Sequence, residues 1–196
     1  CYTGYFDAAT SFRHALFQTV SIASTTGFAS SDFNLWPDFS RYVLLLLMFV
    51  GGCSGSTAGG MKVSRFVILL KVTWAELRRT IHPRLVYSIK MGGRNVPPVV
   101  VGNVTRFFYL YMIVFSTLTL LISLTGLSML DSMGIIAACM SSVGPAFGIV
   151  GPTATYADVS TFGRLVVIAA MILGRLEIFT LLIIMRPDFW RVKRNW

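Results

Sequence analysis

Two short glycine-containing segments, 24-STTGFA-29 and 141-SSVGPA-146, have residue types that can bind a dehydrated cation through the backbone. Such a cation needs oxygen ligands in place of water, and backbone carbonyls supply them when several point at one axis. Glycine permits the required conformations because it reaches positive φ without steric strain. We therefore predict one ion-binding turn at each segment, formed by Thr25, Thr26, Gly27 and Phe28 and by Ser142, Val143, Gly144 and Pro145.

Each of these segments follows an apolar stretch that is too short to cross a membrane, at residues 12–24 and 132–142. We interpret the two stretches as re-entrant half-helices, whose C-terminal ends carry a partial negative charge that favours a cation. Exposed backbone at membrane depth is tolerated where it lines a cavity or packs within protein. The alternative is that Gly27 and Gly144 simply end interfacial helices. Their matching positions in an internal repeat favour the ion-binding turns.

The composition is that of an integral membrane protein. Of the 196 residues, 55% are hydrophobic and only 13% are charged, and the mean hydropathy is +0.70. Soluble domains contain about twice that share of charged residues. We predict membrane spans at 107–130, at 162–185, and at 41–74, the last of which is broken in its middle by glycine and serine.

The net charge of +9 is concentrated in two regions of the chain. Thirteen of the 17 Lys and Arg residues lie within 62–106 and 186–194. The positive-inside rule predicts that both regions, and with them the C-terminus, are cytoplasmic. We therefore read the basic surplus as a topology signal, with a docking surface for an acidic or regulatory partner as the alternative, and expect no nucleic-acid binding.

The order of these elements predicts two copies of one unit, the first incomplete. We expect a repeat lacking its outer helix at 1–80, a cytoplasmic hairpin-like linker at 81–97, a complete repeat at 98–190 and a cytoplasmic tail at 191–196. Because the chain starts at a cysteine and not at a methionine, we expect it to be an internal piece of a longer protein.

Four stretches of the sequence carry a family resemblance. They are 19-TVSIASTTGFASSDFNLWP-37, 51-GGCSGSTAGGMK-62, 82-HPRLVYSIKMGGR-94, and 174-GRLEIFTLL-182 followed by 187-PDFWR-191. Together they resemble the bacterial Trk-type potassium uptake subunits of the Trk/Ktr/HKT superfamily, over essentially the whole chain. The resemblance implies an all-α integral membrane fold built from channel-like repeats, each with an outer helix, a re-entrant pore helix, a filter turn and an inner helix. This chain is similar to the last two of four such repeats.

The resemblance also implies a function and a set of partners. It implies potassium transport through a pseudo-fourfold carbonyl filter, with Gly27 in the third turn and Gly144 in the fourth. The fourth turn departs from the TTGF pattern of the third, although carbonyl ligation tolerates different side chains. The implied partners are the N-terminal repeats of the same protein, a second copy in a homodimer, a cytosolic nucleotide-binding regulatory subunit and the lipid of the bacterial inner membrane. No cofactor is implied other than the transported K⁺, and symport with H⁺ or Na⁺ and simple conduction both stay open.

The glycine-rich stretch in the middle of the broken span resembles the family's intramembrane gate loop. Its candidate gate residues are Gly51, Gly52, Ser54, Gly55, Ser56, Thr57, Gly59 and Gly60. A loop of small residues can reorganise where a helix cannot. A nucleotide-binding P-loop is excluded because Met61 intervenes before Lys62 and no strand precedes the loop. Close helix packing by small residues remains the alternative.

Arg175 is the candidate partner of this loop. It lies 11 residues before Arg186, which is roughly 16 Å along a helix and near mid-membrane. An arginine at that depth costs a few kcal/mol unless it faces a polar interior. Loop carbonyls suit its five donors, whereas Glu177 at i+2 does not face it on a helix. The resemblance implies the same placement, under the filter and beside the loop.

Other functions are less well supported by the sequence. No nucleophile–base set and no metal-spaced histidines or cysteines appear in the sequence, so we expect no enzyme activity and no metal site other than K⁺ at the filter. A non-conducting structural or scaffold half of a membrane complex is the alternative function.

Overall fold

The computed structural model describes residues 7–53, 55–82 and 88–176. The described helices are α1 Ala8–Ala23, α2 Asp38–Phe49, α3 Val63–Ile81, α4 Pro98–Ser123, α5 Met129–Met140 and α6 Thr161–Arg175. Two pairs of two-residue strands join them, β1 Val50–Gly51 with β2 Met61–Lys62, and β3 Lys90–Met91 with β4 Arg94–Asn95. Three short 3₁₀ turns are η1 Phe33–Leu35, η2 Gly148–Val150 and η3 Tyr156–Asp158. The prediction of a helical fold is confirmed, with the two strand pairs as additions to it.

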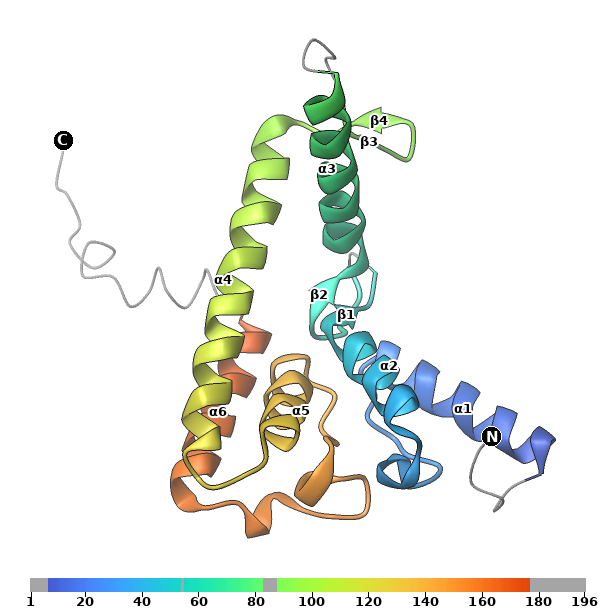
Figure 1. Ribbon diagram of the computed structural model, residues 1–196, viewed down its shortest axis with the longest axis vertical. Coiled ribbons are helices and arrows are strands. Elements are labelled where there is room, and N and C mark those ends of the chain that lie inside the picture. The colour runs from blue at the N-terminus through green and yellow to red at the C-terminus, as the bar shows by residue number, and fades with distance from the viewer. Residues whose placement is uncertain (1–6, 54, 83–87, 177–196) are drawn as a thin grey trace, which may run out of the picture.

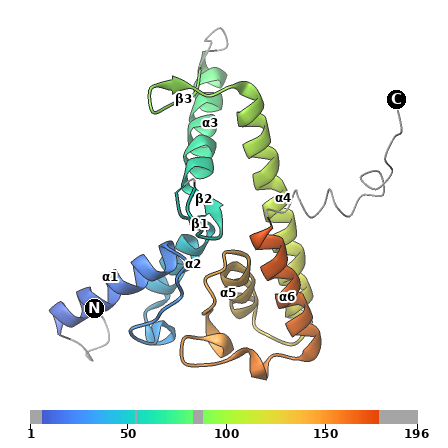
Figure 2. The ribbon, with the colours of Figure 1, turned by 180° about the vertical axis from the view of Figure 1, so that it is seen from behind.

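The helices form an open arrangement, and among the described elements α4 is the longest. Figure 1 shows α3 beside one end of α4, with the β3–β4 hairpin next to the point where they connect, and α5 and α6 along the other half of α4. The reverse view in Figure 2 shows α5 between α4 and α6 on one side and the α1–α2 pair on the other. The end of α5 therefore lies near the middle of the molecule.

The longest helix, α4, differs from the predicted span at 107–130. It begins at Pro98, because proline at the first helical positions is pre-organised for helix. It ends at Ser123, and Gly126 follows with a φ of 86°, a conformation that stops a helix. Within the described part of the chain, α4 is the one helix long and apolar enough to cross a membrane alone.

The predicted break in the span at 41–74 is present. Helix α2 ends at Phe49, and α3 begins at Val63. Between them β1 and β2 pair in parallel, with Val50 opposite Met61 and Gly51 opposite Lys62. The intervening residues 52–60 therefore leave the helical path and return to it as a closed loop, which we call the inserted loop.

Helices are present at both stretches that were predicted as half-helices, with somewhat different bounds. Helix α1 covers Ala8–Ala23 and α5 covers Met129–Met140, each starting a few residues before the predicted stretch. The C-terminal half of α5 is fully buried, whereas α1 exposes Phe12, Leu16 and Val20. Helix α5 is thus the centre of the core, and α1 has one apolar face not covered by the described chain.

Aromatic and amide contacts fix the two halves of the chain to each other. Phe33 and Phe147 meet edge to face with ring centroids 5.4 Å apart. The side chain of Asn34 accepts from the Gly148 N–H at 3.0 Å and donates to the Gly148 carbonyl at 3.3 Å. These contacts join segments more than a hundred residues apart, so the two half-helix units pack as neighbours.

A β-hairpin lies within the stretch 81–97 that was predicted as a hairpin-like cytoplasmic linker. Strands β3 and β4 pair in antiparallel register around Gly92 and Gly93, which both have positive φ. Two consecutive residues with positive φ are typical of a tight hairpin turn. Residues 83–87 of the predicted linker lie outside the described chain.

We predict that the same substitution has opposite effects at two helix glycines. A Cβ at Gly174 in α6 would overlap the Met140 carbonyl oxygen at the end of α5, whereas Gly102 in α4 has open space. Gly174→Ala should therefore lower the melting temperature of the full-length protein in detergent. Gly102→Ala should leave it unchanged or raise it, because alanine favours a helix over glycine by about 1 kcal/mol. Equal shifts in the two variants would contradict this packing.

Candidate functional site

The turns that follow α1 and α5 have the same backbone hydrogen bonds at matching positions. In the first, the N–H groups of Ser24, Thr25 and Thr26 donate to the carbonyls of Val20, Ile22 and Ser21 at 2.9–3.1 Å. In the second, those of Ser141, Ser142 and Val143 donate to the carbonyls of Ala137, Cys139 and Ala138 at 2.9–3.1 Å. The internal similarity seen in the sequence thus corresponds to the same local backbone geometry.

The dihedral angles of the two turns match as well. Thr25 has a φ of 56° and Ser142 a φ of 57°, and Gly27 and Gly144 follow with 75° and 102°. The residues directly after the helix caps are therefore Thr25 and Ser142, so the alternative that the glycines end the helices is wrong. Left-handed conformations cost about 1–3 kcal/mol at non-glycine residues and persist where the surroundings enforce them.

The structure brings the two turns together. A Cβ at Gly27 would overlap the Val143 carbonyl oxygen and lie 3.1 Å from Cδ of Pro145. Gly144 has no atom within reach of such a Cβ, so space is open beside it. Phe28 points elsewhere, because its side chain is 72% exposed. Of the predicted turn residues, Gly27, Val143 and Pro145 are thus in direct contact.

The inserted loop packs against both turns. The N–H of Gly59 donates to the Thr25 hydroxyl at 3.1 Å. A Cβ at Gly59 would overlap the Ser141 carbonyl oxygen, and one at Gly51 would overlap the Gly59 carbonyl oxygen. Small residues are therefore required at both positions. This close packing serves a structural role and also places the loop directly next to the turns.

Cationic side chains bind three consecutive carbonyls of the inserted loop. Arg175 donates from Nη1 to the Thr57 carbonyl at 2.7 Å, as the sequence analysis expected of this residue. Lys62 donates from Nζ to the carbonyls of Ser56 and Ala58 at 2.6 and 3.0 Å. Of the other residues named with this loop, Ser54 and Glu177 lie outside the described chain.

The sequence did not lead us to predict that Lys62 binds the inserted loop, because the residue was used there as a topology signal and to exclude a P-loop. A usable signal was present, because Lys62 directly follows the glycine-rich motif. A cation placed where a loop of unpaired carbonyls returns to a helix is well positioned to bind them.

A cavity of about 250 Å³ adjoins the inserted loop. Three cationic side chains line it, those of Lys62, Arg65 and Arg175. The Arg65 guanidinium also lies 4.3 Å from the centre of the Phe107 ring. No carboxylate is among the described residues that line the cavity.

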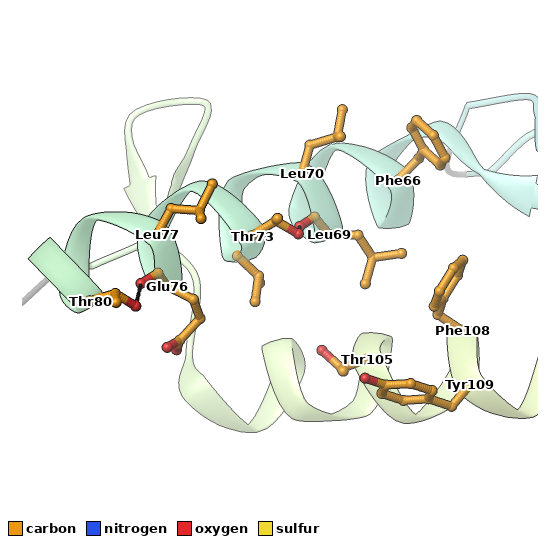
Figure 3. Close-up of a pocket in the computed structure, with 11 residues that line it drawn as sticks. Phe66, Leu69, Leu70, Thr73, Glu76, Leu77, Thr80, Thr105, Phe108 and Tyr109 are labelled. Atoms are coloured by element: carbon orange, nitrogen blue, oxygen red, sulfur yellow. Dashed lines mark hydrogen bonds between the residues drawn. The ribbon is translucent and has the colours of Figure 1, made fainter.

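A second cavity lies between α3 and α4 and does not resemble an ion site. Its volume is about 520 Å³, and Figure 3 shows Leu69, Phe66 and Phe108 among the side chains around it. A dehydrated cation needs several oxygen ligands directed at one point, whereas most of the exposed lining of this cavity is apolar. Among the described residues, no group of three or more His, Cys, Asp or Glu could hold a metal ion.

The segment between α5 and α6 supports the second turn. The Tyr156 hydroxyl donates to the Gly144 carbonyl at 2.7 Å and lies 3.4 Å from Sγ of Cys139. Burial raises the pKa of Tyr156 above its ordinary value, so the hydroxyl keeps its proton at physiological pH. Sequence reasoning did not find Tyr156, because nothing in the local pattern distinguishes it from other loop tyrosines.

Arg164 lies near the start of the span predicted at 162–185. It lies in the first turn of α6, which begins at Thr161. Its Nε donates to the Val159 carbonyl at 2.9 Å and its Nη2 to the Ala157 carbonyl at 3.3 Å. The charge therefore sits at the end of the helix, where it binds the η3 turn.

Comparison with known proteins places the chain in a class. It matches the family model described as TrkH, cation transport protein, over residues 2–191. It is 45% identical over 190 residues to the Trk system potassium uptake protein TrkH of Vibrio parahaemolyticus, covering 97% of this chain and 38% of that protein. It is 40% identical over 187 residues to the TrkH protein of Escherichia coli K12, covering 95% of this chain and 38% of the relative.

The solved structures give the same result. The chain superimposes on the crystal structure of the potassium transporter TrkH from Vibrio parahaemolyticus with a TM-score of 0.87 and 44% identity, covering 96% of this chain and 40% of that one. Fold and sequence thus define a helical membrane protein of the cation-transport class.

The chain belongs to the TrkH cation transport protein family, which confirms the resemblance to Trk-type subunits. The relatives' names describe transporters and not enzymes, in agreement with the expectation of no enzyme activity. The chain spans about 38% of the length of these curated relatives.

We predict that alanine is tolerated less well at Gly27 than at Gly144. Both positions have positive φ, which costs an alanine about 1 kcal/mol. Only at Gly27 would the added Cβ also overlap a carbonyl of the other turn. Gly27→Ala should therefore lower the melting temperature of the full-length protein clearly more than Gly144→Ala. A larger loss in the Gly144 variant would show that the turns are not in contact as described.

Proposed function

We propose that this chain is the C-terminal part of a potassium transporter, and that its two turns form half of a K⁺ filter. The main support is the contact between Gly27 and the Val143–Pro145 segment at the ends of two half-helices. The relatives support the ion, because they are named as potassium uptake proteins. The filter residues in this proposal are Thr25, Thr26, Gly27, Phe28, Ser142, Val143, Gly144 and Pro145.

The filter acts through backbone oxygens and helix ends. Carbonyls that point at a common axis replace the water shell of K⁺. The C-terminal ends of α1 and α5 both adjoin the turns and add partial negative charge there. In this proposal the first 80 residues are a third repeat without its outer helix, and residues 98–190 are the fourth repeat.

The remainder of the pore comes from outside this chain. The N-terminal repeats of the same protein supply the other two turns and cover the apolar face of α1, where Phe12 is 69% exposed. The complete protein is a multi-pass protein of the bacterial inner membrane with a cytoplasmic C-terminus. It forms a homodimer and binds a cytosolic nucleotide-binding regulatory subunit on its basic side.

We propose in addition that the inserted loop is a gate held closed in this structure. Thr25 binds it from the filter side, while Arg175 and Lys62 bind its carbonyls from the cavity side. The charges of Arg175 and Lys62 beside the loop oppose the passage of K⁺ while the loop is in place. Withdrawal of the loop breaks these bonds and carries its carbonyls away from the path.

The transport proposal is tested by potassium uptake of the full-length protein in a potassium-deficient bacterial strain. Wild type and Gly102→Ala should restore growth at low K⁺, and Gly27→Ser should not, because a side chain at Gly27 overlaps the opposite turn. Membrane abundance of each variant is measured by immunoblot. Uptake by Gly27→Ser at the wild-type rate would contradict the filter, and no uptake by wild type would favour the scaffold alternative.

The gate proposal is tested by K⁺ flux in proteoliposomes without a regulatory partner. Arg175→Ala, Lys62→Gln, or shortening of residues 51–60 should each raise basal flux. A hydrogen bond to a charged group contributes about 1.5–3 kcal/mol, so each point variant should raise flux by at least about tenfold. Arg78→Gln removes an exposed cation of α3 away from the loop and should leave flux unchanged. Unchanged flux in all three loop variants would eliminate the gate.

A further inference from the structure

We propose that Tyr156 is a positioning residue that sets the direction of the Gly144 carbonyl and thereby the discrimination between K⁺ and Na⁺. This inference rests on the proposed function, because it assigns a role within the filter. It begins from the 2.7 Å hydrogen bond that the Tyr156 hydroxyl donates to the Gly144 carbonyl oxygen. That oxygen belongs to the glycine that defines the second turn.

The Tyr156 hydroxyl is held in place by a contact of the side chain itself and by the local structure of its backbone. On its inner side it lies 3.4 Å from Sγ of Cys139, which is buried in α5. Its backbone belongs to η3, where the Thr155 hydroxyl accepts from the Ala157 N–H at 3.4 Å. Tyr156 is therefore fixed against α5, the helix that ends at the same turn.

Arg164 connects this support to α6. It donates to the carbonyls of Val159 and Ala157, which lie on either side of the end of η3. Val159 itself is buried. A continuous series of contacts thus runs from α6 through η3 and Tyr156 to the Gly144 carbonyl.

The first turn has a hydroxyl tether too, but it comes from a different place. The Ser21 hydroxyl, on α1, donates to the Phe28 carbonyl at 2.6 Å. Aligning Gly27 with Gly144 puts Ala138, which has no hydroxyl, at the position of Ser21. The segments that follow the two turns differ in length before α2 and α6 begin, so Tyr156 has no position-matched residue after the first turn. Two turns with the same backbone thus each have a carbonyl bound by a hydroxyl, supplied by unrelated positions. The two bound carbonyls are at different positions of the turns, because Phe28 aligns with Pro145, so the tether on the Gly144 carbonyl is a feature of the second turn.

The consequence for selectivity follows from the chemistry of a carbonyl ligand. An oxygen that accepts a hydrogen bond is fixed in direction and has one lone pair fewer for an ion. Discrimination between K⁺ and Na⁺ depends on the number, field strength and freedom of the carbonyls around the ion. Loss of the tether frees the Gly144 carbonyl to turn towards a smaller ion, so Na⁺ should be excluded less well.

The experiment compares K⁺ and Na⁺ flux through the full-length protein in proteoliposomes. Tyr156→Phe, which removes one oxygen atom, should keep substantial K⁺ flux and lower the K⁺/Na⁺ flux ratio several-fold. Tyr109→Phe removes the same atom from an exposed tyrosine of α4 and should leave the ratio unchanged. A purely structural role would change the amount of active protein and both fluxes together, but not their ratio.

The outcomes for the wild type, Tyr156→Phe and Arg164→Gln separate this inference from the transport proposal. A wild-type ratio in Tyr156→Phe overturns this inference and leaves the transport proposal intact, whereas no K⁺ flux in the wild type overturns both. If Tyr156→Phe does not reach the membrane, Arg164→Gln provides the test, because it loosens η3 from α6 while keeping the phenol. A lowered ratio in that variant supports the tether, and an unchanged ratio overturns it.

Discussion

Direct contact between backbone segments is the constraint on which this structure depends. Gly27 meets the Val143 carbonyl, Gly59 meets the Ser141 carbonyl, and Gly174 meets the Met140 carbonyl, in each case with no room for a Cβ. Three such contacts gather α1, α6 and the inserted loop around the C-terminal end of α5. Because side chains are excluded there, peptide oxygens are the main polar groups at the centre of the molecule. Buried peptide oxygens must find donors or ions.

The carbonyls of the inserted loop and those of the two turns are bound by different kinds of hydrogen-bond donor. The loop carbonyls of Ser56, Thr57 and Ala58 are bound by the charged groups of Lys62 and Arg175. The carbonyls of the turns are bound by neutral hydroxyls, at Gly144 and Phe28. A charged donor in the turn would repel a cation, whereas a neutral one orients a carbonyl without that cost. Under the proposed function, the charges thus gather at the gate and are kept out of the filter.

Sequence reasoning identified the elements whose signals are local. Short apolar stretches ending at glycine predicted α1, α5 and their turns, and the dense glycines at 51–60 predicted the break between α2 and α3. Sequence reasoning missed the contacts between residues that are far apart in the sequence. Arg175 and Thr57 are 118 residues apart, and this pairing was anticipated only in general terms, as contact with loop carbonyls. Tyr156 and Lys62 were not anticipated at all. The bounds of α4 were wrong because hydropathy alone located the span, while Pro98 and Gly126 determine its ends.

Helix α6 is the element that relates the two parts of the site. Arg164 near its start binds η3 and so supports Tyr156, while Arg175 at its end binds the inserted loop. Gly174 fits α6 against the Met140 carbonyl so closely that the helix has little freedom to slide along α5. A movement of α6 would disturb the Gly144 carbonyl through η3 and Tyr156. The inserted loop, by contrast, lies outside the helices and consists mostly of small residues. Besides the β1–β2 pairing, it is held by hydrogen bonds to Thr25, Lys62 and Arg175, which can break without unfolding a helix. Under the proposed function, the loop is therefore the part that can move while α6 and the filter stay in place.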